Sequence, residues 1–198
     1  MEAFDLALAR TLANEGGYVN DPDDSGGETY RGISRVNFPG WPGWGYIDQI
    51  KAHGMVKREI EANADLARLG AQFYREQFWD RLAGDALPPD VAAELFDTAV
   101  NTGVHRAVLW MQQALNLLNR NATDYPDIVE DGVMGPGTTR ALESYLKQNT
   151  TGPLLKVMNV LQGQHYIDCM RKSPTQEKYA RGWLNRVAMQ PTAQGGQT

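Results

Sequence analysis

The sequence predicts a mainly α protein, and three observations support that fold class. Apolar residues recur at helical spacing through most of the chain, no β-type run is longer than a few residues, and glycine and proline gather in two interrupting segments. The 198 residues are 42% hydrophobic and 22% charged, which is a globular composition and excludes a disordered or fibrous chain. This length allows one domain or two small ones.

The first expected helix carries Phe4, Leu8 and Leu12, which recur at every fourth position and therefore share one face. Gly16 and Gly17 follow this stripe. Glycine favours the left-handed conformation that ends many helices, so we expect the helix to stop there.

Similar apolar stripes predict the later helices. They are expected near residues 58–78, 91–100, 104–118, 138–148, 153–171 and 174–189. The last of these begins with Ser173, Pro174 and Thr175 followed by Gln176, a capping-box pattern with proline at the first helical position.

Two segments break the helical pattern. Residues 16–46 are rich in glycine and acidic residues and end in a run of proline, glycine and aromatic residues, in which Trp41 and Trp44 either form a cleft wall or pack in the core. Residues 119–137 contain several Gly and Pro turn signals. Loops of this length inside a compact domain usually have a function.

The charge of the chain is unevenly distributed. Residues 1–100 hold 9 basic and 17 acidic side chains, whereas residues 101–198 hold 10 basic and 7 acidic ones, and the whole chain has a net charge of −5. A groove for nucleic acid needs a strongly basic surface, which neither half offers. We therefore expect no nucleic-acid partner.

Metal and cofactor signals are weak. The three histidines show no zinc-ligand spacing, and the calcium-loop start at Asp21 reaches Gly32 where a bidentate glutamate is needed. His165 and Cys169 stand at i and i+4, which is more typical of a buried thiol than of a catalytic dyad. The single cysteine cannot form an internal disulfide, and no apolar run is long enough to span a membrane. We expect no metal, no cofactor and no integral membrane segment.

Glu15 is placed like a general acid. It stands at the C-terminal end of the first expected helix, where the helix dipole disfavours the ionised carboxylate and raises its pKa. Glycosidases pair such an acid with a second carboxylate, and Asp24 in the glycine-rich segment is the candidate. From the residues alone, a solvated helix end followed by a polar acidic loop is an equally weighted interpretation.

The segment from Glu15 to Ser34 resembles a known family. Glu-Gly-Gly-Tyr at 15–18, followed by Asp-x-Gly-Gly-x-Thr-x-x-Gly-Ile at 24–33, is similar to the signature of the N-acetylmuramidases of glycoside hydrolase family 108, which include phage endolysins and bacterial secretion-linked muramidases. The later half resembles the helical peptidoglycan-binding module that accompanies this catalytic domain. The resemblance covers residues 4–188 and continues through Phe78-Trp79-Asp80, Leu87-Pro88, the segment 95–103 and the segment 131–136.

This resemblance implies a domain organisation and a set of site residues. A lysozyme-like catalytic domain would occupy residues 1–97, packed on a helical module at 98–189, with a flexible tail at 190–198. Glu15 matches the catalytic acid, and Asp24 and Thr29 match positions that hold water in the similar pattern of classical phage lysozymes. Asp24 and Thr29 are one residue closer here than in that pattern, which leaves a retaining or inverting outcome open. The expected substrate contacts are Tyr18, Asn20, Tyr30, Tyr74, Trp79 and Asn101, with core packing as the alternative for Trp79 and helix capping for Asn101.

The implied function is hydrolysis of the β-1,4 bond from N-acetylmuramic acid to N-acetylglucosamine, with peptidoglycan glycan strands as the partner and a monomer as the active form. The expected biology is a phage endolysin held in the bacterial host cytoplasm and released onto periplasmic peptidoglycan. The alternatives are a bacterial secretion-linked muramidase, a lytic transglycosylase and a non-catalytic peptidoglycan-binding protein.

Overall fold

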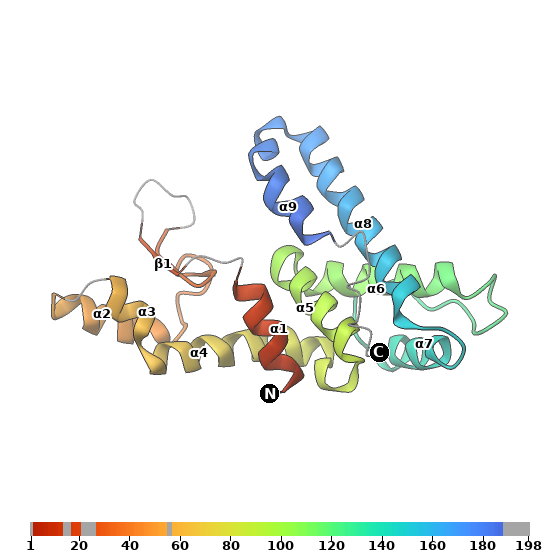
Figure 1. Cartoon of the computed structure of the whole chain (residues 1–198), viewed down its shortest axis with the longest axis horizontal. Coiled ribbons are helices and arrows are strands. Elements are labelled where there is room, and N and C mark those ends of the chain that lie inside the picture. Colours follow the sequence, from red (N-terminus) through yellow and green to blue (C-terminus); the bar gives the residue numbers. More distant parts are fainter. Residues whose placement is uncertain (1, 14–16, 21–26, 55–56, 188–198) are drawn as a thin grey trace, which may run out of the picture. The chain divides into compact units, whose positions relative to one another are not determined.

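The chain divides into two compact units, Met1–Leu87 and Pro88–Thr198. A computed structural model describes residues 2–13, 17–20, 27–54 and 57–187 (Figure 1). Helices dominate both units, which confirms the mainly α fold class. The predicted tail at 190–198 lies outside the described residues.

The structural division lies ten residues before the expected boundary at Asp97. Helix α5 (Pro89–Thr102) causes this difference, because it packs on the later helices α6 (Val104–Leu118) and α8 (Thr151–Lys172). A helix that begins before the expected boundary therefore belongs to the core of the second unit.

The described residues of the first unit form four α-helices and a series of short helical turns. These are α1 (Ala3–Leu12), α2 (Gly43–Ala52), α3 (Lys57–Ala62), α4 (Ala64–Tyr74), the π-helical η1 (Arg75–Trp79) and the 3-10 turns η2 (Asp80–Leu82) and η3 (Gly84–Ala86). A capping box between Glu2 and Asp5 starts α1, whose Phe4 ring meets the buried Trp79 edge-on at 5.4 Å. This contact ties the start of the chain to the end of the α4–η1 helix.

Two helical predictions for this unit were wrong. The single helix expected near 58–78 is interrupted at Asn63, whose side chain accepts a hydrogen bond from Leu66 N at 3.0 Å and so caps α4. Helix α2 begins at Gly43, inside the run that we expected to be a loop. Trp44 stabilises it there, since its ring is buried and its Nε1 donates to Phe38 O at 2.8 Å.

A small antiparallel sheet lies between α1 and α2 in the sequence. Its strands are β1 (Tyr18–Val19), β2 (Thr29–Tyr30) and β3 (Ile33–Ser34), in the order β1-β2-β3. Arg31 and Gly32 form the two-residue turn between β2 and β3, and both have positive φ (44° and 83°), as a type I′ turn requires. The glycine of the Gly-Ile motif thus supplies a turn conformation.

The second unit is a bundle of α5, α6, α7 (Pro136–Leu146), α8 and α9 (Ala180–Arg186), with a 3-10 turn η4 (Pro174–Tyr179) before α9. Figure 1 shows α9 running back beside α8, and the Tyr166 and Trp183 rings stack between them at 5.1 Å. The expected single helix at 174–189 is therefore a 3-10 turn and a short α-helix. Ser173 provides no side-chain cap for it, because its hydroxyl contacts Thr175.

Side-chain amides of α6 hold the long loop over 119–135. Gln112 Nε2 donates to Asp131 Oδ1 at 2.8 Å, and Gln112 Oε1 accepts from Gly132 N at 2.8 Å. One turn later, Asn116 binds both the carbonyl and the N–H of Ile128, each at 2.9 Å. The second interrupting segment is therefore fastened along one helix, and the Asp131-Gly132 motif serves this attachment.

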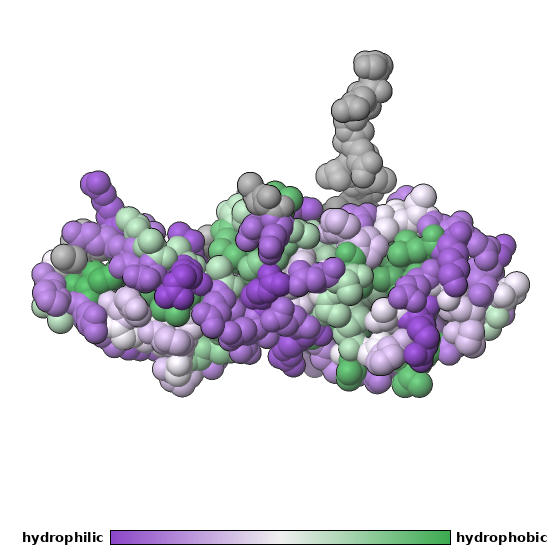
Figure 2. Space-filling model, turned by 90° about the horizontal axis from the view of Figure 1, so that it is seen from below, coloured by the Kyte–Doolittle hydropathy of each residue, from purple (hydrophilic) through white to green (hydrophobic). Residues whose placement is uncertain are grey.

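The surface drawn in Figure 2 carries its hydrophobic residues in separate patches among hydrophilic ones. The exposed apolar side chains of the described residues include Leu117, Val129 and Val133 in the second unit. None of the helices in the described ranges combines the length and the apolar character needed to cross a membrane.

Candidate active site

The two expected carboxylates, Glu15 and Asp24, lie outside the described residues. The structure does place the residues next to them in the sequence. Gly17 lies against Glu61 of α3 so closely that a Cβ on it would stand 2.0 Å from Glu61 Oε1. The same carboxylate oxygen accepts a hydrogen bond from Tyr18 N at 3.0 Å. The second glycine of the Glu-Gly-Gly-Tyr motif is therefore needed for close packing where the chain enters β1.

Thr29 lies half-buried on the face of the small sheet opposite the Tyr18–Tyr30 pair, beside the buried Ser34 of β3. It pairs with Val19, and these two residues face away from the buried Tyr18–Tyr30 pair. The Thr29 hydroxyl donates to Gly27 O at 3.2 Å, and a hydroxyl can accept a further hydrogen bond while it donates one. Its position therefore allows Thr29 to accept a hydrogen bond from a water molecule above the sheet.

Tyr18 and Asn20, two expected substrate contacts, lie together. The Tyr18 hydroxyl donates to Glu28 Oε1 at 2.5 Å, and the Asn20 side chain also hydrogen-bonds to that hydroxyl. Burial raises the pKa of Tyr18 and the neighbouring Glu28 carboxylate raises it further, so the phenol stays protonated. The Tyr18 ring is buried, and Asn20 is the exposed member of the pair.

Glu28 is the centre of a charged cluster that the sequence analysis did not identify. Arg35 joins its Oε2 at 2.5 Å and also binds Asp48 of α2, while Lys51 Nζ lies 3.0 Å from Glu28 Oε1. Burial opposes ionisation of Glu28, but hydrogen bonds from Tyr18, Arg35 and Lys51 outweigh it and lower its pKa. The cluster connects β1 and α2 through Glu28, which directly precedes β2, and Arg35, which directly follows β3. Asp48 and Lys51, an acid and a base three positions apart in α2, were the signal in the sequence for this charged cluster.

Three of the expected sugar-binding aromatic residues are core residues. Tyr30 and Trp79 have no exposed surface and Tyr74 is 2% exposed. The Tyr74 hydroxyl donates to Arg31 O at 2.6 Å, and Trp79 Nε1 donates to Asp85 Oδ1 at 2.8 Å. These rings support the β2–β3 turn and the η1 segment and do not offer a flat face to solvent, in line with the packing alternative given for Trp79.

Asn101 lies at the end of α5 in the second unit. Its Oδ1 accepts a hydrogen bond from the Tyr166 hydroxyl of α8 at 2.6 Å. Asp97, one turn earlier, pairs with Arg186 of α9 at 2.9 Å, and both side chains are largely buried. The Asp97-to-Asn101 motif thus holds α8 and α9 on α5.

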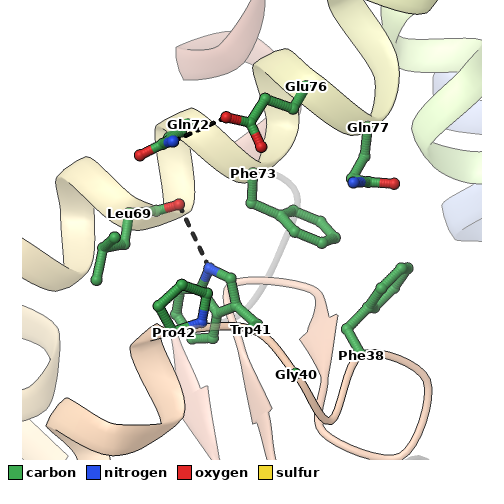
Figure 3. Close-up of a pocket in the computed structure, with 9 residues that line it drawn as sticks. All are labelled: Phe38, Gly40, Trp41, Pro42, Leu69, Gln72, Phe73, Glu76 and Gln77. Atoms are coloured by element: carbon green, nitrogen blue, oxygen red, sulfur yellow. Dashed lines mark hydrogen bonds between the residues drawn. The ribbon is translucent and has the colours of Figure 1, made fainter.

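Within the first unit, a pocket of about 280 Å³ opens between the segment before α2 and the α4–η1 helix (Figure 3). Trp41, for which a cleft wall and core packing were the two expected roles, lines this pocket. The sequence motifs did not indicate its other lining residues. The lining residues are Phe38, Gly40, Trp41, Pro42, Leu69, Gln72, Phe73, Glu76 and Gln77. The aromatic run at 38–44 was a signal for its lower wall.

No group of three or more His, Cys, Asp or Glu residues in the described ranges is arranged to hold a metal ion, and the Asp21–Gly26 segment lies outside those ranges. Cys169 Sγ lies 3.5 Å from His165 Nε2. Burial lowers the pKa of His165, and the nearby Arg106 charge lowers it further, so the imidazole is neutral at pH 7. A neutral imidazole provides no charge to stabilise a thiolate.

Comparison with known proteins also finds two domains, but with a boundary after α5 where the structural division lies before it. A family model described as "Glycosyl hydrolase 108" matches residues 8–103, and one described as "Predicted Peptidoglycan domain" matches residues 106–188. Among solved structures, the chain is similar to SagA of Brucella abortus, with 25% identity, a TM-score of 0.58, and coverage of 93% of this chain and 88% of that one. The search of curated proteins gave no significant match.

The two family models together account for nearly all of the described chain, and the solved structure matches across both units. The chain is a glycoside hydrolase of the N-acetylmuramidase type, and it belongs to the glycosyl hydrolase 108 family with a peptidoglycan domain following its catalytic domain.

Proposed function

We propose that the protein cleaves the β-1,4 bond from N-acetylmuramic acid to N-acetylglucosamine, with Glu15 as the general acid. The observation that carries this proposal is the succession of a glycosyl hydrolase domain and a peptidoglycan domain in one chain. The first domain supplies the bond-breaking chemistry, and the second directs it to the glycan of the cell wall.

Glu15 follows the last residue of α1, Leu12, by three positions. A carboxyl group near the C-terminal end of a helix is held more readily in its protonated form, which suits donation of a proton to the leaving glycosidic oxygen. Asp24 and Thr29 then hold the attacking water or stabilise the positive charge that develops on the sugar. The Thr29 hydroxyl, which donates to Gly27 O and can still accept a hydrogen bond, supports this assignment.

Replacement of Glu15 by Gln tests the proposal. The substitution keeps the side-chain volume but removes the transferable proton, so clearing of outer-membrane-stripped cells should slow by about 10²–10⁴-fold. The thermal midpoint should stay the same or rise, because a neutral amide does not repel the negative end of the helix dipole. A folded Glu15→Gln protein that clears walls at the parental rate would refute the assignment.

Product analysis distinguishes hydrolysis from the rival enzyme reaction. Asp24 and Thr29 are one residue closer than in the pattern that holds water in phage lysozymes. The rival enzyme is therefore a lytic transglycosylase, whose reaction needs no attacking water. Mass spectrometry of the digest should show reducing N-acetylmuramic acid ends, and anhydro-sugar ends would establish the transglycosylase. Because the chain belongs to a family of glycoside hydrolases, the alternative of a non-catalytic peptidoglycan-binding protein is set aside.

We also propose that the protein acts as a phage endolysin, held in the host cytoplasm until the membrane is breached. The hydrolase domain and the peptidoglycan domain in one chain support a role in degrading the wall, which an endolysin shares with a secretion-linked muramidase. Expression in a bacterial cytoplasm should be tolerated until chloroform permeabilises the membrane, after which the culture should lyse within minutes. A culture that keeps its turbidity after chloroform treatment would overturn the endolysin role, and local gaps in the walls of growing cells that export the protein would favour a secretion-linked muramidase.

A further inference from the structure

The peptide unit between Gly17 and Tyr18, where the chain enters β1, has both of its polar groups held. The Gly17 carbonyl accepts a hydrogen bond from Arg31 N at 3.0 Å, and Tyr18 N donates to Glu61 Oε1, also at 3.0 Å. A peptide unit is planar, so rotating it would break both bonds together. The direction in which the chain runs back from Gly17 toward Glu15 is therefore fixed at this point.

The partner on the carbonyl side is itself anchored. Arg31 lies in the β2–β3 turn, and its own carbonyl accepts a hydrogen bond from the buried Tyr74 hydroxyl of α4 at 2.6 Å. The group that Arg31 offers to Gly17 is a backbone N–H, which every residue except proline possesses. This half of the anchorage therefore does not depend on the side chain at position 31.

The partner on the N–H side is a side chain from another element. Glu61 lies near the end of α3, which packs on β1 and has Ile60 buried beside Glu61. Lys57, one turn earlier, places its Nζ 3.7 Å from the same Oε1 that binds Tyr18 N. A carboxylate accepts a stronger hydrogen bond from an N–H than a neutral oxygen does. This half of the anchorage thus depends on which side chain occupies position 61.

Gly17 leaves the space that the Glu61 carboxylate occupies. A Cβ on Gly17 would stand 2.0 Å from Glu61 Oε1 and 2.8 Å from Glu61 Cδ. The φ of Gly17 lies outside the left-handed region, so glycine is required here for space and not for backbone conformation. The contact can therefore be broken from either side, at residue 17 or at residue 61.

We propose that Glu61 is a positioning residue for the general acid. The proposal rests on the muramidase function proposed above, in which Glu15 donates the proton. Glu15 precedes Gly17 by two residues, and two residues of chain span at most about 7 Å. Holding the Gly17–Tyr18 peptide therefore limits the positions open to the Glu15 backbone. Glu61 touches no substrate in this role and acts only through the main chain.

Positioning of this kind has a large effect on rate. A general acid must lie within hydrogen-bond reach of the oxygen that it protonates. A misplacement of about 1 Å can slow a reaction about 10²-fold, even when it is caused by a change away from the reacting atoms. Loss of the Glu61 acceptor should therefore lower kcat while the groups that bind the glycan, and with them KM, stay unchanged.

Variants of the full chain at position 61 test this role on solubilised, uncrosslinked peptidoglycan strands. Glu61→Ala removes the acceptor, and kcat should fall about 10–100-fold with KM unchanged. Glu61→Gln keeps a side-chain oxygen that can accept from Tyr18 N, so it should restore most of the lost rate. Glu143→Ala, the same replacement at an exposed position of α7, is the matched control and should keep the parental kcat.

Gly17→Ala breaks the contact while Glu61 is still present. Its methyl group would displace the flexible end of the Glu61 side chain, and kcat should fall by a factor similar to that of Glu61→Ala. Because both changes remove one contact, the double variant should be no slower than the slower single variant. Multiplied losses in the double variant would show that the two residues act separately and would overturn the proposed route from Glu61 to Glu15.

Amide hydrogen exchange provides a measurement that does not depend on activity. In the Glu15→Gln background, exchange of the Tyr18 N–H should be at least about tenfold faster with Glu61→Ala and should return toward the parental rate with Glu61→Gln. Unchanged protection of this amide in Glu61→Ala would overturn the anchorage.

The kinetic outcomes separate positioning from a purely structural role. Parental kcat per folded molecule in Glu61→Ala, with only a lower thermal midpoint, would overturn the proposal, as would a Glu61→Gln variant as slow as Glu61→Ala. Failure of the muramidase function is seen elsewhere, in the wall products of the unmodified protein and in the rate of Glu15→Gln. A parent that releases muramidase products while Glu61→Ala keeps its kcat loses only the positioning role.

Discussion

The hydroxyl of Tyr166 donates a hydrogen bond of 2.6 Å to Asn101 Oδ1, joining α8 to the last turn of α5. Gln162 Nε2 extends this network, lying 3.1 Å from the same hydroxyl and 3.4 Å from Thr98 Oγ1. The side chain that the sequence analysis gave as an expected substrate contact, Asn101, is thus engaged inside the second unit. Its contribution should be visible in stability.

We expect Asn101→Ala to lower the free energy of unfolding by about 1 kcal/mol, because it removes one hydrogen bond and leaves the Tyr166 hydroxyl without that acceptor. Tyr166→Phe should cost a similar amount, and the double variant should cost less than the sum, since both changes break the same bond. Denaturant titration measures all three. Loss of wall clearing in Asn101→Ala at parental stability would instead assign Asn101 to the substrate.

A fragment of residues 1–97 should fail to fold cooperatively. It carries most of α5, whose buried Val91, Leu95 and Phe96 pack within the second unit on helices that the fragment lacks. Exposure of this apolar face favours aggregation. Size-exclusion chromatography and calorimetry should show an aggregated or molten fragment, whereas residues 88–198 should unfold in a single transition. A monomeric 1–97 fragment with full lytic activity would contradict the expectation.

Removal of the hydroxyl from two tyrosines of the first unit should have different effects on the free energy of unfolding. Tyr74→Phe removes the 2.6 Å bond to Arg31 O and should cost about 1–2 kcal/mol of unfolding free energy. Tyr30 is equally buried, but its hydroxyl has no hydrogen-bond partner among the described residues. Tyr30→Phe should therefore be neutral or stabilising. Thermal unfolding of the pair gives the comparison, and a larger loss in Tyr30→Phe would show that its hydroxyl is satisfied in solution.

The charged cluster around Glu28 should make stability depend on pH. Its pKa is lowered in the folded state, so ionised Glu28 stabilises the fold fully above its ordinary value of 4.5, and this contribution is lost as the pH falls through the lower folded value. Glu28→Gln should cost about 1–3 kcal/mol at pH 7, because Tyr18, Arg35 and Lys51 lose an ionised acceptor. The difference between parent and variant in denaturant titrations should shrink toward pH 3. A constant difference would show that its charge is not involved.

Asp24→Asn should slow wall clearing strongly, but by less than Glu15→Gln, because an amide can still hold a water molecule. Thr29→Val removes the hydroxyl of β2 and tests its proposed hydrogen bond to the same water. Initial rates of turbidity loss from pH 4 to pH 8 measure both effects. Full activity of Asp24→Asn across this range would direct attention to Asp21 or Asp23 as the second carboxylate.

Periodicity alone located most of the helices, because each buries a stripe that recurs every three to four residues. The stripe from Ala62 to Phe73 could not reveal the break at Asn63, since a capping side chain leaves the apolar spacing unchanged. The start of helix α2 was not predicted, because glycine and proline dominate the sequence there. The hydrogen bond from Trp44 Nε1 to Phe38 O that stabilises it is not visible in the pattern of residue types.

The site was harder to predict than the fold. Sequence motifs nominated Thr29, Tyr18 and Asn20, which the structure places on or beside the small sheet and which remain predicted site residues. They gave no means of distinguishing an aromatic residue that faces a ligand from one that supports the backbone, as Tyr74 and Trp79 do. The pocket escaped notice because Phe38 and Phe73 are far apart in the sequence and meet only in three dimensions.

Helix α5 also bears on how proteins of this kind can exchange parts during evolution. The match to the hydrolase family ends at residue 103, yet α5 is fastened to later helices by the Asp97–Arg186 and Asn101–Tyr166 pairs. A crossover between genes at that family boundary would give α5 foreign neighbours that lack these partners. A crossover between Leu87 and Pro88 would transfer the helix together with them. Viable chimaeras should therefore inherit the end of the hydrolase sequence from the donor of the wall-directed domain.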